Sequence, residues 1–397
     1  MSEERRLRRA AGQRSGGGMN VMESPVTRRQ AIGMGVVGGV SLYLFGCGGS
    51  DGDSTSAGTV ASATEPSTKP DQLIVRNWGD PWSTTWQASA GKAFEADTGI
   101  KVVWDTTDGQ VIQSKIQTAI RADSRPPVDA VVNIETLSYL SSVQELSIAM
   151  NPDLIPNIAS LNNSTAHPDG LDDWAYMGLY TYLHPIVYNS DKMDAPTSWE
   201  DLFDPSLEGR IQMTSAYTSV MYPFAKMLGL TPGEDDMGPV WDKIEELRPN
   251  IAGVGDSTDF VKGAVSGDYW CGMQLAGDAA AAVEQGVPIK AAVPEEGAVL
   301  DRDCYYVLRN LPEETTYYAQ VFCDYMVSKE AQTAIMSNNK VVPVNLDVEL
   351  SKEMKADPRV YPFTEDEVAE VGIIPTPSVA AEHDADWQAQ YDRAVKG

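Results

Sequence analysis

The sequence predicts an α/β protein built as two domains, and three observations lead to that prediction. Short apolar segments typical of buried strands alternate with segments whose apolar residues recur at helical spacing. The connections between these segments are short, as in a mainly parallel sheet that helices cover on both faces. The chain has 397 residues, which exceeds what one hydrophobic core usually holds.

The alternation is clearest in the first third of the chain. Predicted strands lie at 73–78, 101–106 and 128–134. A helix begins near Trp82 and ends near Gly99, a plausible C-cap, and a second helix spans 111–120. Further strands are expected at 183–189, 209–215, 289–293 and 304–310, and further helices at 219–228, 239–247, 258–266, 278–285 and 315–337.

The N-terminal segment has the pattern of an export signal. Arg28 and Arg29 precede sixteen uncharged residues, 31–46, that are too few and too rich in glycine to span a bilayer comfortably. A paired arginine before such a stretch indicates a Tat-type signal, which we place over residues 1–46. An uncleaved membrane anchor is the alternative, and the chain offers three possible starts: Met1, Met19 and Met22.

The residues that follow this signal predict attachment to a membrane surface. Leu44-Phe45-Gly46-Cys47 resembles a bacterial lipobox, so we expect a lipid anchor on Cys47. Residues 47–70 are rich in Gly, Ser, Thr, Pro and Ala and should form a disordered tether. The protein is therefore expected outside the cytoplasm, in the periplasm or at the outer face of the cytoplasmic membrane.

The charge of the chain excludes several kinds of partner. Residues 1–46 hold seven of the 30 basic residues and three of the 57 acidic ones, so the rest of the chain carries a net charge of −31. Such a charge repels nucleic acid and anionic lipid and attracts cations to any cleft. A high-salt habitat would explain the same acidity without reference to a ligand.

Known catalytic and metal-binding motifs are missing from the sequence. It contains no HExxH, GxSxG or P-loop motif, and no Cys/His spacing typical of a zinc site. The cysteines other than Cys47 are odd in number, so at least one is a free thiol or pairs with another chain: Cys271, Cys304 and Cys323. We therefore expect no cofactor, no bound metal and no enzymatic activity.

From about residue 71 onward the chain resembles the extracellular solute-binding proteins of ABC importers, nearest the spermidine/putrescine-binding group. The blocks that carry the resemblance are 74–78, 94–104, 128–132, 196–211 and 286–303. The resemblance implies a periplasmic-binding-protein-like fold of two α/β lobes joined by hinge strands, with the ligand in the cleft between them. It places lobe one at 71–185 plus 303–347 and lobe two at 186–302 plus 348–397. It also implies a monomer that captures a small solute and delivers it to an ABC permease.

The first candidate binding segment follows the first predicted strand. Ligands of parallel sheets bind beyond the carboxyl ends of strands, which places Trp78, Asp80 and Trp82 at the mouth of the cleft. Trp78 matches the position where the polyamine-binding relatives use an aromatic ring to face an alkylammonium chain. A tryptophan face attracts an ammonium by about 0.5–2 kcal/mol. The alternative for Trp78 is a position in the hydrophobic core. The alternative for Trp82 is packing on a helix face that it shares with Trp86.

Two acidic residues form the second candidate. Asp303 matches the family's carboxylate that pairs with a ligand amine, and Asp301 replaces a family aromatic. A desolvated ammonium needs an opposing carboxylate to offset its lost hydration. The alternative is a solvated acidic turn over 301–303.

The sequence departs from the polyamine-binding pattern at two places. The family's acidic pair is absent from 214–219, and Leu275 replaces an aromatic. A linear diamine or triamine is therefore disfavoured. Ser215 and Thr218 suit a ligand with hydrogen-bonding oxygens near a helix N-terminus. An amino-bearing metabolite with one cationic end, or an anionic group held at that terminus, fits this pattern.

The remaining candidates are Tyr182 and His184, in the segment that crosses between lobes, and Glu135, at the end of the third strand. For His184 the alternative is a structural role, and for Glu135 it is a helix cap. Ferric ion, thiamine or a phosphonate are the alternative ligands. An exported α/β enzyme and a sensor that partners a membrane receptor are the alternative functions.

Overall fold

The computed structural model describes residues 60–397 apart from 169–170, 172, 276–281, 284 and 356–360. The predicted export signal and Cys47 therefore lie outside the described residues, as does most of the helix expected over 278–285. All described elements belong to one compact unit, Asp53–Gly397. Part of the expected tether contacts this unit, because the backbone N–H of Ala61 donates to the carbonyl of Ala149.

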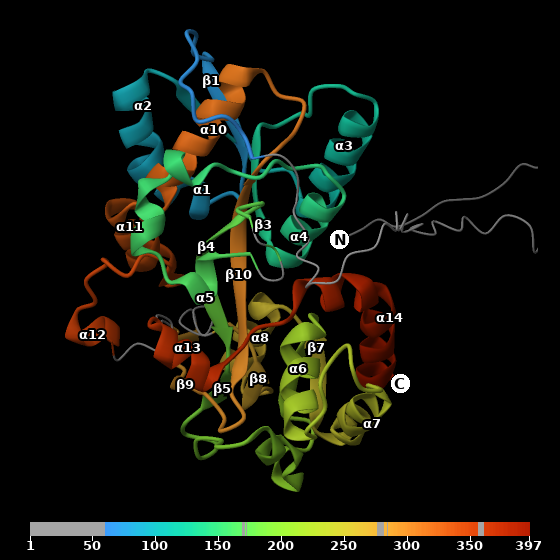
Figure 1. Ribbon diagram of the computed structural model, residues 1–397. Helices are drawn as coiled ribbons and strands as arrows, with labels where there is room; N and C mark the ends of the chain where they lie inside the picture. Colours follow the sequence, from blue (N-terminus) through green and yellow to red (C-terminus); the bar gives the residue numbers. More distant parts are fainter. Residues whose placement is uncertain (1–59, 169–170, 172, 276–281, 284, 356–360) are drawn as a thin grey trace, which may run out of the picture. The chain divides into compact units, whose positions relative to one another are not determined.

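The first sheet has seven strands, and its long strand β10 lies between β4 and β3 (Figure 1). Its order is β11-β4-β10-β3-β1-β2, with β12 paired to β10. Its strands are β1 (Gln72–Arg76), β2 (Lys101–Asp105), β3 (Ala130–Ile134), β4 (Met177–His184), β10 (Ala298–Val307), β11 (Val342–Pro343) and β12 (Gly372–Ile373). β1 is parallel to β2 and β3, and β12 is parallel to β10. β10 is antiparallel to β3 and β4, so the sheet is mixed.

The second sheet has five strands in the order β7-β6-β8-β5-β9. They are β5 (Ile186–Asn189), β6 (Ile211–Thr214), β7 (Ile251–Gly255), β8 (Cys271–Met273) and β9 (Ile289–Ala292). β6 is parallel to β7 and β8, whereas β5 is antiparallel to β8 and β9. The predicted α/β class is confirmed, but both sheets are mixed and not mainly parallel.

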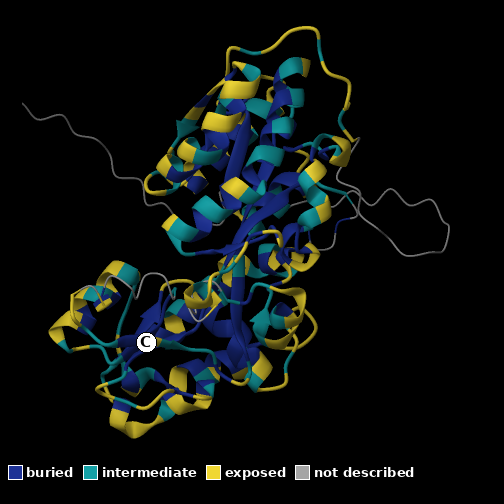
Figure 2. Ribbon diagram, turned by 90° about the vertical axis from the view of Figure 1, so that its left-hand side faces the viewer, coloured by how far each residue is buried: buried dark blue, intermediate teal, exposed yellow. Residues whose placement is uncertain are grey.

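Helices cover both sheets, and Figure 2 shows buried strands beneath helices whose outer faces are exposed. The longer helices are α3 (Gly109–Arg121), α4 (Glu135–Val143), α6 (Thr218–Met227), α7 (Gly238–Glu246), α8 (Ser257–Ser266), α10 (Glu313–Met326), α11 (Lys329–Asn339) and α14 (Pro377–Lys396). The shorter ones are α1 (Trp82–Trp86), the π-helical η1 (Gln87–Gly91), α2 (Lys92–Thr98), α5 (Asn163–Ala166), α12 (Lys352–Lys355) and α13 (Glu365–Val371). The 3₁₀ turns are η2 (Pro152–Leu154), η3 (Pro156–Ser160), η4 (Trp199–Phe203), η5 (Pro205–Leu207) and η6 (Arg248–Asn250).

Strands β4 and β10 contribute to the cores of both sheets. Leu300 of β10 packs in the core that also contains α6, α7 and α14. Tyr305 of the same strand packs in the core formed by α1, α2, α10 and α11. β4 does likewise through Leu183 and Tyr180. The centre of the β4–β10 pair is therefore held from both ends.

Three sequence predictions differ from the structure in ways that matter later. The strand expected over 183–189 is two strands in different sheets, because Pro185 separates β4 from β5. β10 begins at Ala298, so residues 301–303 lie inside a strand and not in a solvated turn. The helix expected over 315–337 is two helices, because the Ser328 side chain caps α11 by accepting from the Ala331 N–H. The predicted end of the first helical segment at Gly99 is confirmed, with φ +77°.

Gly178 of β4 provides a test of this packing. An added Cβ would lie 2.1 Å from the carbonyl oxygen of Thr165 in α5. We expect Gly178→Ala to lower the free energy of unfolding by about 3 kcal/mol, because backbone cannot yield as a flexible side chain does. Gly209→Ala is the control. It meets no atom within 4 Å, so it should cost only about 1 kcal/mol for its left-handed backbone. Equal losses in urea unfolding would contradict this packing.

Candidate functional site

The carboxylate of Asp303, in the middle of β10, is the centre of the candidate site. Its side chain is buried, yet no described lysine or arginine forms an ion pair with it. Three neutral groups donate to it instead. Trp78 Nε1 and the Tyr180 hydroxyl donate to Oδ2 over 2.6 and 2.5 Å, and the Tyr182 hydroxyl donates to Oδ1 over 3.2 Å.

Burial dominates the protonation of this carboxyl group. Desolvation raises the pKa of Asp303 to about 6, and the nearby charge of Asp301 adds to the rise. The hydrogen bonds from Tyr180, Trp78 and Tyr182 oppose the rise because they stabilise the ionised form. At neutral pH the site therefore holds a buried anion whose charge is only partly compensated.

Trp78 lies where the chain leaves β1, in a turn that Gly79 makes possible with φ +93°. Its side chain is 37 % exposed, so the indole is not enclosed in a core. The guanidinium of Arg76 lies 4.1 Å from the centre of the indole ring. Arg76 is itself buried and donates to the carbonyls of Thr107 and Val132. One end of the site is thus an indole with a fixed positive charge beside it.

A connected group of polar side chains forms the other end of the site. Asp301 pairs with Tyr182 in the β10–β4 ladder, and its Oδ2 lies 3.0 Å from His184 Nε2. These two atoms are close but not aligned for a hydrogen bond. His184 Nδ1 lies 3.0 Å from the Ser219 hydroxyl of α6. Ser219, His184 and Asp301 follow the order of a nucleophile, base and acid, but Ser219 is fully buried and no substrate reaches it.

Aromatic side chains from α6 and α14 surround this end. Tyr217 and Tyr222 pack edge-on against Trp387. The hydroxyl of Tyr222 is buried and has no hydrogen-bond partner in the described structure. The Tyr217 hydroxyl has no aligned partner either, although the Asp384 carboxylate is close enough to add to the rise of its pKa. Burial and then the charge of Asp301 raise the pKa of Tyr222.

Among the other predicted residues, Trp82 lies beside this site, whereas Asp80 has a local structural contact. Trp82 stacks on Tyr180 with ring centres 4.7 Å apart, so it supports a residue that binds Asp303. Asp80 accepts from the Thr84 N–H and hydroxyl at the start of α1.

Glu135, Ser215 and Thr218 have contacts outside the Asp303 group. Glu135 forms an ion pair with Arg302, on the opposite face of β10 from Asp301 and Asp303. Ser215 and Thr218 lie at the start of α6, where the Ser215 carbonyl accepts from Gln388.

Sequence reasoning missed Tyr180, Arg76 and Tyr222. Tyr180, Tyr182 and His184 are spaced two residues apart, so in a strand their side chains lie on the same face. This spacing could have identified Tyr180 from the sequence. Arg76 lies inside an apolar strand, and Tyr222 inside a helix, with no local motif to mark either.

Other features of the described residues offer no competing site. They contain no group of three or more His, Cys, Asp or Glu side chains able to hold a metal ion, and no helix apolar and long enough to cross a bilayer. The three described cysteines are buried: Cys271, Cys304 and Cys323.

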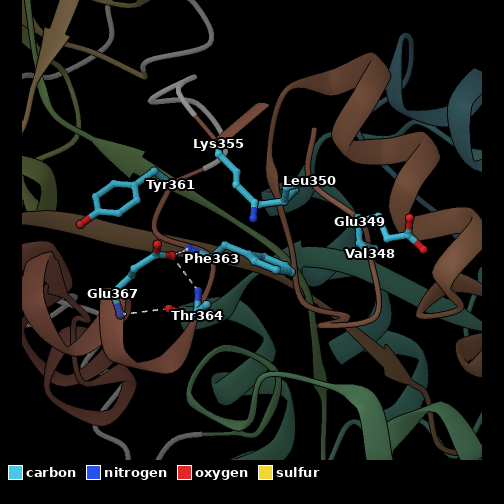
Figure 3. Close-up of a pocket in the computed structure, with 8 residues that line it drawn as sticks. All are labelled: Val348, Glu349, Leu350, Lys355, Tyr361, Phe363, Thr364 and Glu367. Atoms are coloured by element: carbon cyan, nitrogen blue, oxygen red, sulfur yellow. Dashed lines mark hydrogen bonds between the residues drawn. The ribbon is translucent and has the colours of Figure 1, made fainter. Parts of the chain in front are cut away.

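A cavity of about 490 Å³ lies beside α12 and α13 (Figure 3). Its Glu367 carboxylate caps α13 by accepting from the N–H groups of Phe363 and Thr364. None of the residues expected to bind ligand lines this cavity.

Comparisons with known proteins agree with this geometry. Residues 89–362 match the model of the bacterial extracellular solute-binding protein family. The putrescine-binding periplasmic protein PotF of Escherichia coli is 24% identical over 339 residues, 77% of this chain and 86% of the relative.

Solved structures share the fold at low sequence identity. The spermidine/putrescine substrate-binding protein PotD of Streptococcus pneumoniae superposes with TM-score 0.66 at 20% identity, over 82% of this chain and 100% of that one. A GABA receptor superposes with TM-score 0.67 at 19% identity, over 82% and 98%.

The raised pKa of Asp303 predicts how stability depends on pH. Its ordinary value is 3.8, so the folded protein holds this proton more tightly than the unfolded chain. The resulting stabilisation is complete below pH 3.8 and is lost as pH rises through about 6. Relative to Asp303→Asn, the wild type should lose up to about 3 kcal/mol of unfolding free energy between pH 4 and pH 8. Urea unfolding of both proteins measures this, and a difference independent of pH would contradict it.

Proposed function

This chain belongs to the bacterial extracellular solute-binding protein family, and we propose that it captures a small amine-bearing solute beside Trp78 and Asp303. Members of this family bind substrates for transporters and are not enzymes. The protein is accordingly the solute-binding component of an ABC transporter. The solute, its binding residues and the membrane attachment are the parts that we propose.

One observation carries the proposal, which is a buried carboxylate without a paired cation next to an exposed indole. Asp303 has three neutral donors and no ion-pair partner among the described residues, and the guanidinium of Arg76 lies on the other side of the Trp78 ring system that binds it. A ligand ammonium supplies that partner and at the same time meets the edge of Trp78 or the face that Arg76 does not cover. The ion pair then forms in a site already shielded from water, where the attraction is stronger than at the surface.

The ligand that fits best has one cationic end and polar oxygens. PotF binds putrescine, yet here the segment 214–219 carries no acid to hold a second ammonium. The hydroxyls of Ser215 and Thr218 lie at the start of α6 and suit oxygen atoms of a ligand. The GABA receptor shares the fold, and GABA has a single ammonium group. We therefore favour an amino-bearing metabolite of this class over a linear polyamine.

Capture and delivery follow from the fold in this proposal. Lobe one comprises 71–185 plus 303–347 and lobe two 186–302 plus 348–397, with the solute in the cleft between them. The lobes close over it by bending where β4 passes into β5 at Pro185. A permease in the membrane recognises the closed form. A Tat-type signal directs the protein across the cytoplasmic membrane, and a lipid on Cys47 then holds it at the outer face.

Trp78→Ala tests the role of the indole. It removes the ring that faces the ammonium and one of the donors to Asp303, so it should weaken solute binding more than tenfold in calorimetry. The protein should stay folded because Trp78 is not in a core. Trp78→Phe keeps a ring but loses the N–H donor. Its affinity for the solute should therefore lie between those of the wild type and Trp78→Ala. Unchanged affinity in Trp78→Ala would refute the proposed binding mode.

A thermal-shift screen at pH 7.5 tests the ligand class. GABA-like monoamines should raise the melting temperature, because a ligand at 100 times its Kd stabilises a protein by about 2.7 kcal/mol. Putrescine and spermidine should give little or no rise, since no second acidic pair is present. Thiamine, a phosphonate and ferric citrate complete the panel as alternative ligands. A clear rise with putrescine or spermidine would refute the predicted selectivity.

A further inference from the structure

Residues 60–70, which we call the arm, lie against the domain built on the first sheet. Val60 forms a parallel β-bridge with Ala149, and the backbone N–H of Ala61 donates to the Ala149 carbonyl over 3.1 Å. The side-chain amide of Asn151 donates to the Ala61 carbonyl over 3.0 Å. Both backbone polar groups of Ala61 are therefore bonded to this domain, which holds the first part of the arm on its surface.

The rest of the arm is bonded to helices of the same domain. Tyr318 of α10 is buried, and its hydroxyl donates to the carboxylate of Glu65 over 2.9 Å. The ammonium of Lys69 lies 5.4 Å from the centre of the same ring and donates to the carbonyl of Thr98, at the end of α2, over 3.4 Å. Hydrogen bonds to charged groups are stronger than those between neutral groups. The arm is thus attached at three places along its length.

The arm is attached at the end of the first sheet that lies away from the second sheet. β10 runs from Ala298, in the core of the second sheet, to Val307, in the core of the first. The segment that pairs with the arm lies beside this far end, because the N–H of Ile148 donates to the Val307 carbonyl. The arm leads into the start of β1 beside α10 (Figure 1), whereas Trp78 follows the other end of β1, roughly 20 Å away.

We propose that the arm fastens the membrane anchor to the far end of lobe one, so that lobe one is held towards the bilayer and lobe two moves when the cleft closes. This inference rests on the proposed lipid on Cys47 and the proposed lobes, and it adds which lobe is fixed. In the described structure no hydrogen bond of the arm reaches residues 186–302 or 348–397 of lobe two. Closure can therefore leave the arm in place.

Attachment of the arm shortens the chain that separates the protein from the bilayer. Thirteen residue steps lead from Cys47 to Val60, and 25 lead from Cys47 to Gln72. A fully extended chain spans at most about 3.5 Å per step, so the limit falls from about 88 Å to about 45 Å. Effective concentration falls roughly as the −3/2 power of linker length, so the shorter chain raises the concentration of lobe one at the membrane roughly threefold.

The first test measures whether the arm is attached, using limited proteolysis of the full chain by elastase. Tyr318→Phe removes the donor to Glu65, and Asn151→Asp removes the donor to Ala61 but keeps the oxygen that caps η2. The arm sequence itself is unchanged. Together the two substitutions should speed cleavage after Ala61, followed by mass spectrometry, at least tenfold, because cleavage follows the population of the detached arm.

Tyr325→Phe is the matched control. It removes a tyrosine hydroxyl of the same helix α10 that donates to a carboxylate over the same 2.9 Å, but its partner is Asp97 and not the arm. It should change the cleavage rate less than twofold. Equal melting temperatures show that the variants are folded, and Tyr318→Phe alone, which keeps the buried ring, replaces the double variant if that unfolds. A cleavage rate equal to that of the wild type would overturn the attachment.

The second test measures which lobe lies nearer the bilayer. The lipidated chain is placed on phosphatidylcholine vesicles that carry an acceptor dye on their headgroups. A donor dye is attached at Ala96→Cys in α2 or at Val265→Cys in α8, both exposed positions. Energy transfer should be stronger from Ala96→Cys, and Tyr318→Phe with Asn151→Asp should reduce the difference between the two sites. Equal transfer from both sites, or stronger transfer from Val265→Cys, would overturn the orientation.

Detergent phase partitioning separates this inference from the proposal on which it rests. A chain that stays in the aqueous phase carries no lipid, which overturns both the proposed attachment at Cys47 and the orientation inferred from it. A chain that enters the detergent phase but gives equal energy transfer overturns the orientation alone. Neither result bears on capture of an amine beside Trp78, which the thermal-shift screen tests independently.

Discussion

The site depends on one constraint, a carboxylate buried in the middle of a strand with neutral donors in place of a counter-ion. Burying an anion costs free energy, and the three hydrogen bonds to Asp303 recover part of it. The recovery is incomplete, since burial still raises the pKa of this group to about 6. The free protein therefore keeps an unfavourable charge in place, and a bound cation relieves it. Folding thus buries the charge before any ligand arrives, and its neutralisation by the proposed ligand would contribute to the free energy of binding.

The fold can hold such a charge because of how β4 and β10 are built into it. Each strand packs into one hydrophobic core near one end and into the other core near the other end. Asp301 and Asp303 lie between Leu300 and Tyr305, at the passage from one core to the other. A register irregularity follows directly after Asp303. Strand ends anchored in two cores leave the polar centre little freedom, so the acids stay in place despite their repulsion.

Local sequence pattern was enough to predict most elements but not their membership in sheets. The strand at 183–189 was recognised from its apolar residues, yet only the proline at 185 reveals that it divides between two sheets. A solvated turn was the alternative to a binding site for Asp301 and Asp303, because charged residues are rare in buried strands. Their strand character follows from pairing with Tyr182 and Tyr180, a long-range contact that no local window contains.

The residues of the candidate site also differ in how far the sequence predicted them. Trp78 and Asp303 were found from a strand end and a family resemblance, and the structure joins them by a hydrogen bond. Tyr222 and Trp387 come from helices that are distant in sequence, and they reach the site only through packing of α6 and α14. Arg76 places a positive charge beside the indole, yet a lone arginine in an apolar strand carries no motif. The residues that we propose to contact the ligand were thus more predictable than those that surround them.

Local charges, and not the acidity of the whole chain, must decide which cation binds. The net charge of −27 attracts every cation, but at physiological salt its effect fades over about 8 Å and does not distinguish one amine from another. Inside the site the charges are few and fixed. Arg76 is positive at the indole end, Asp303 and Asp301 are negative along β10, and the start of α6 is neutral. This order of charges is why the proposed ligand has one ammonium: a second one would lie against Arg76 or at the start of α6, where the segment 214–219 has no carboxylate.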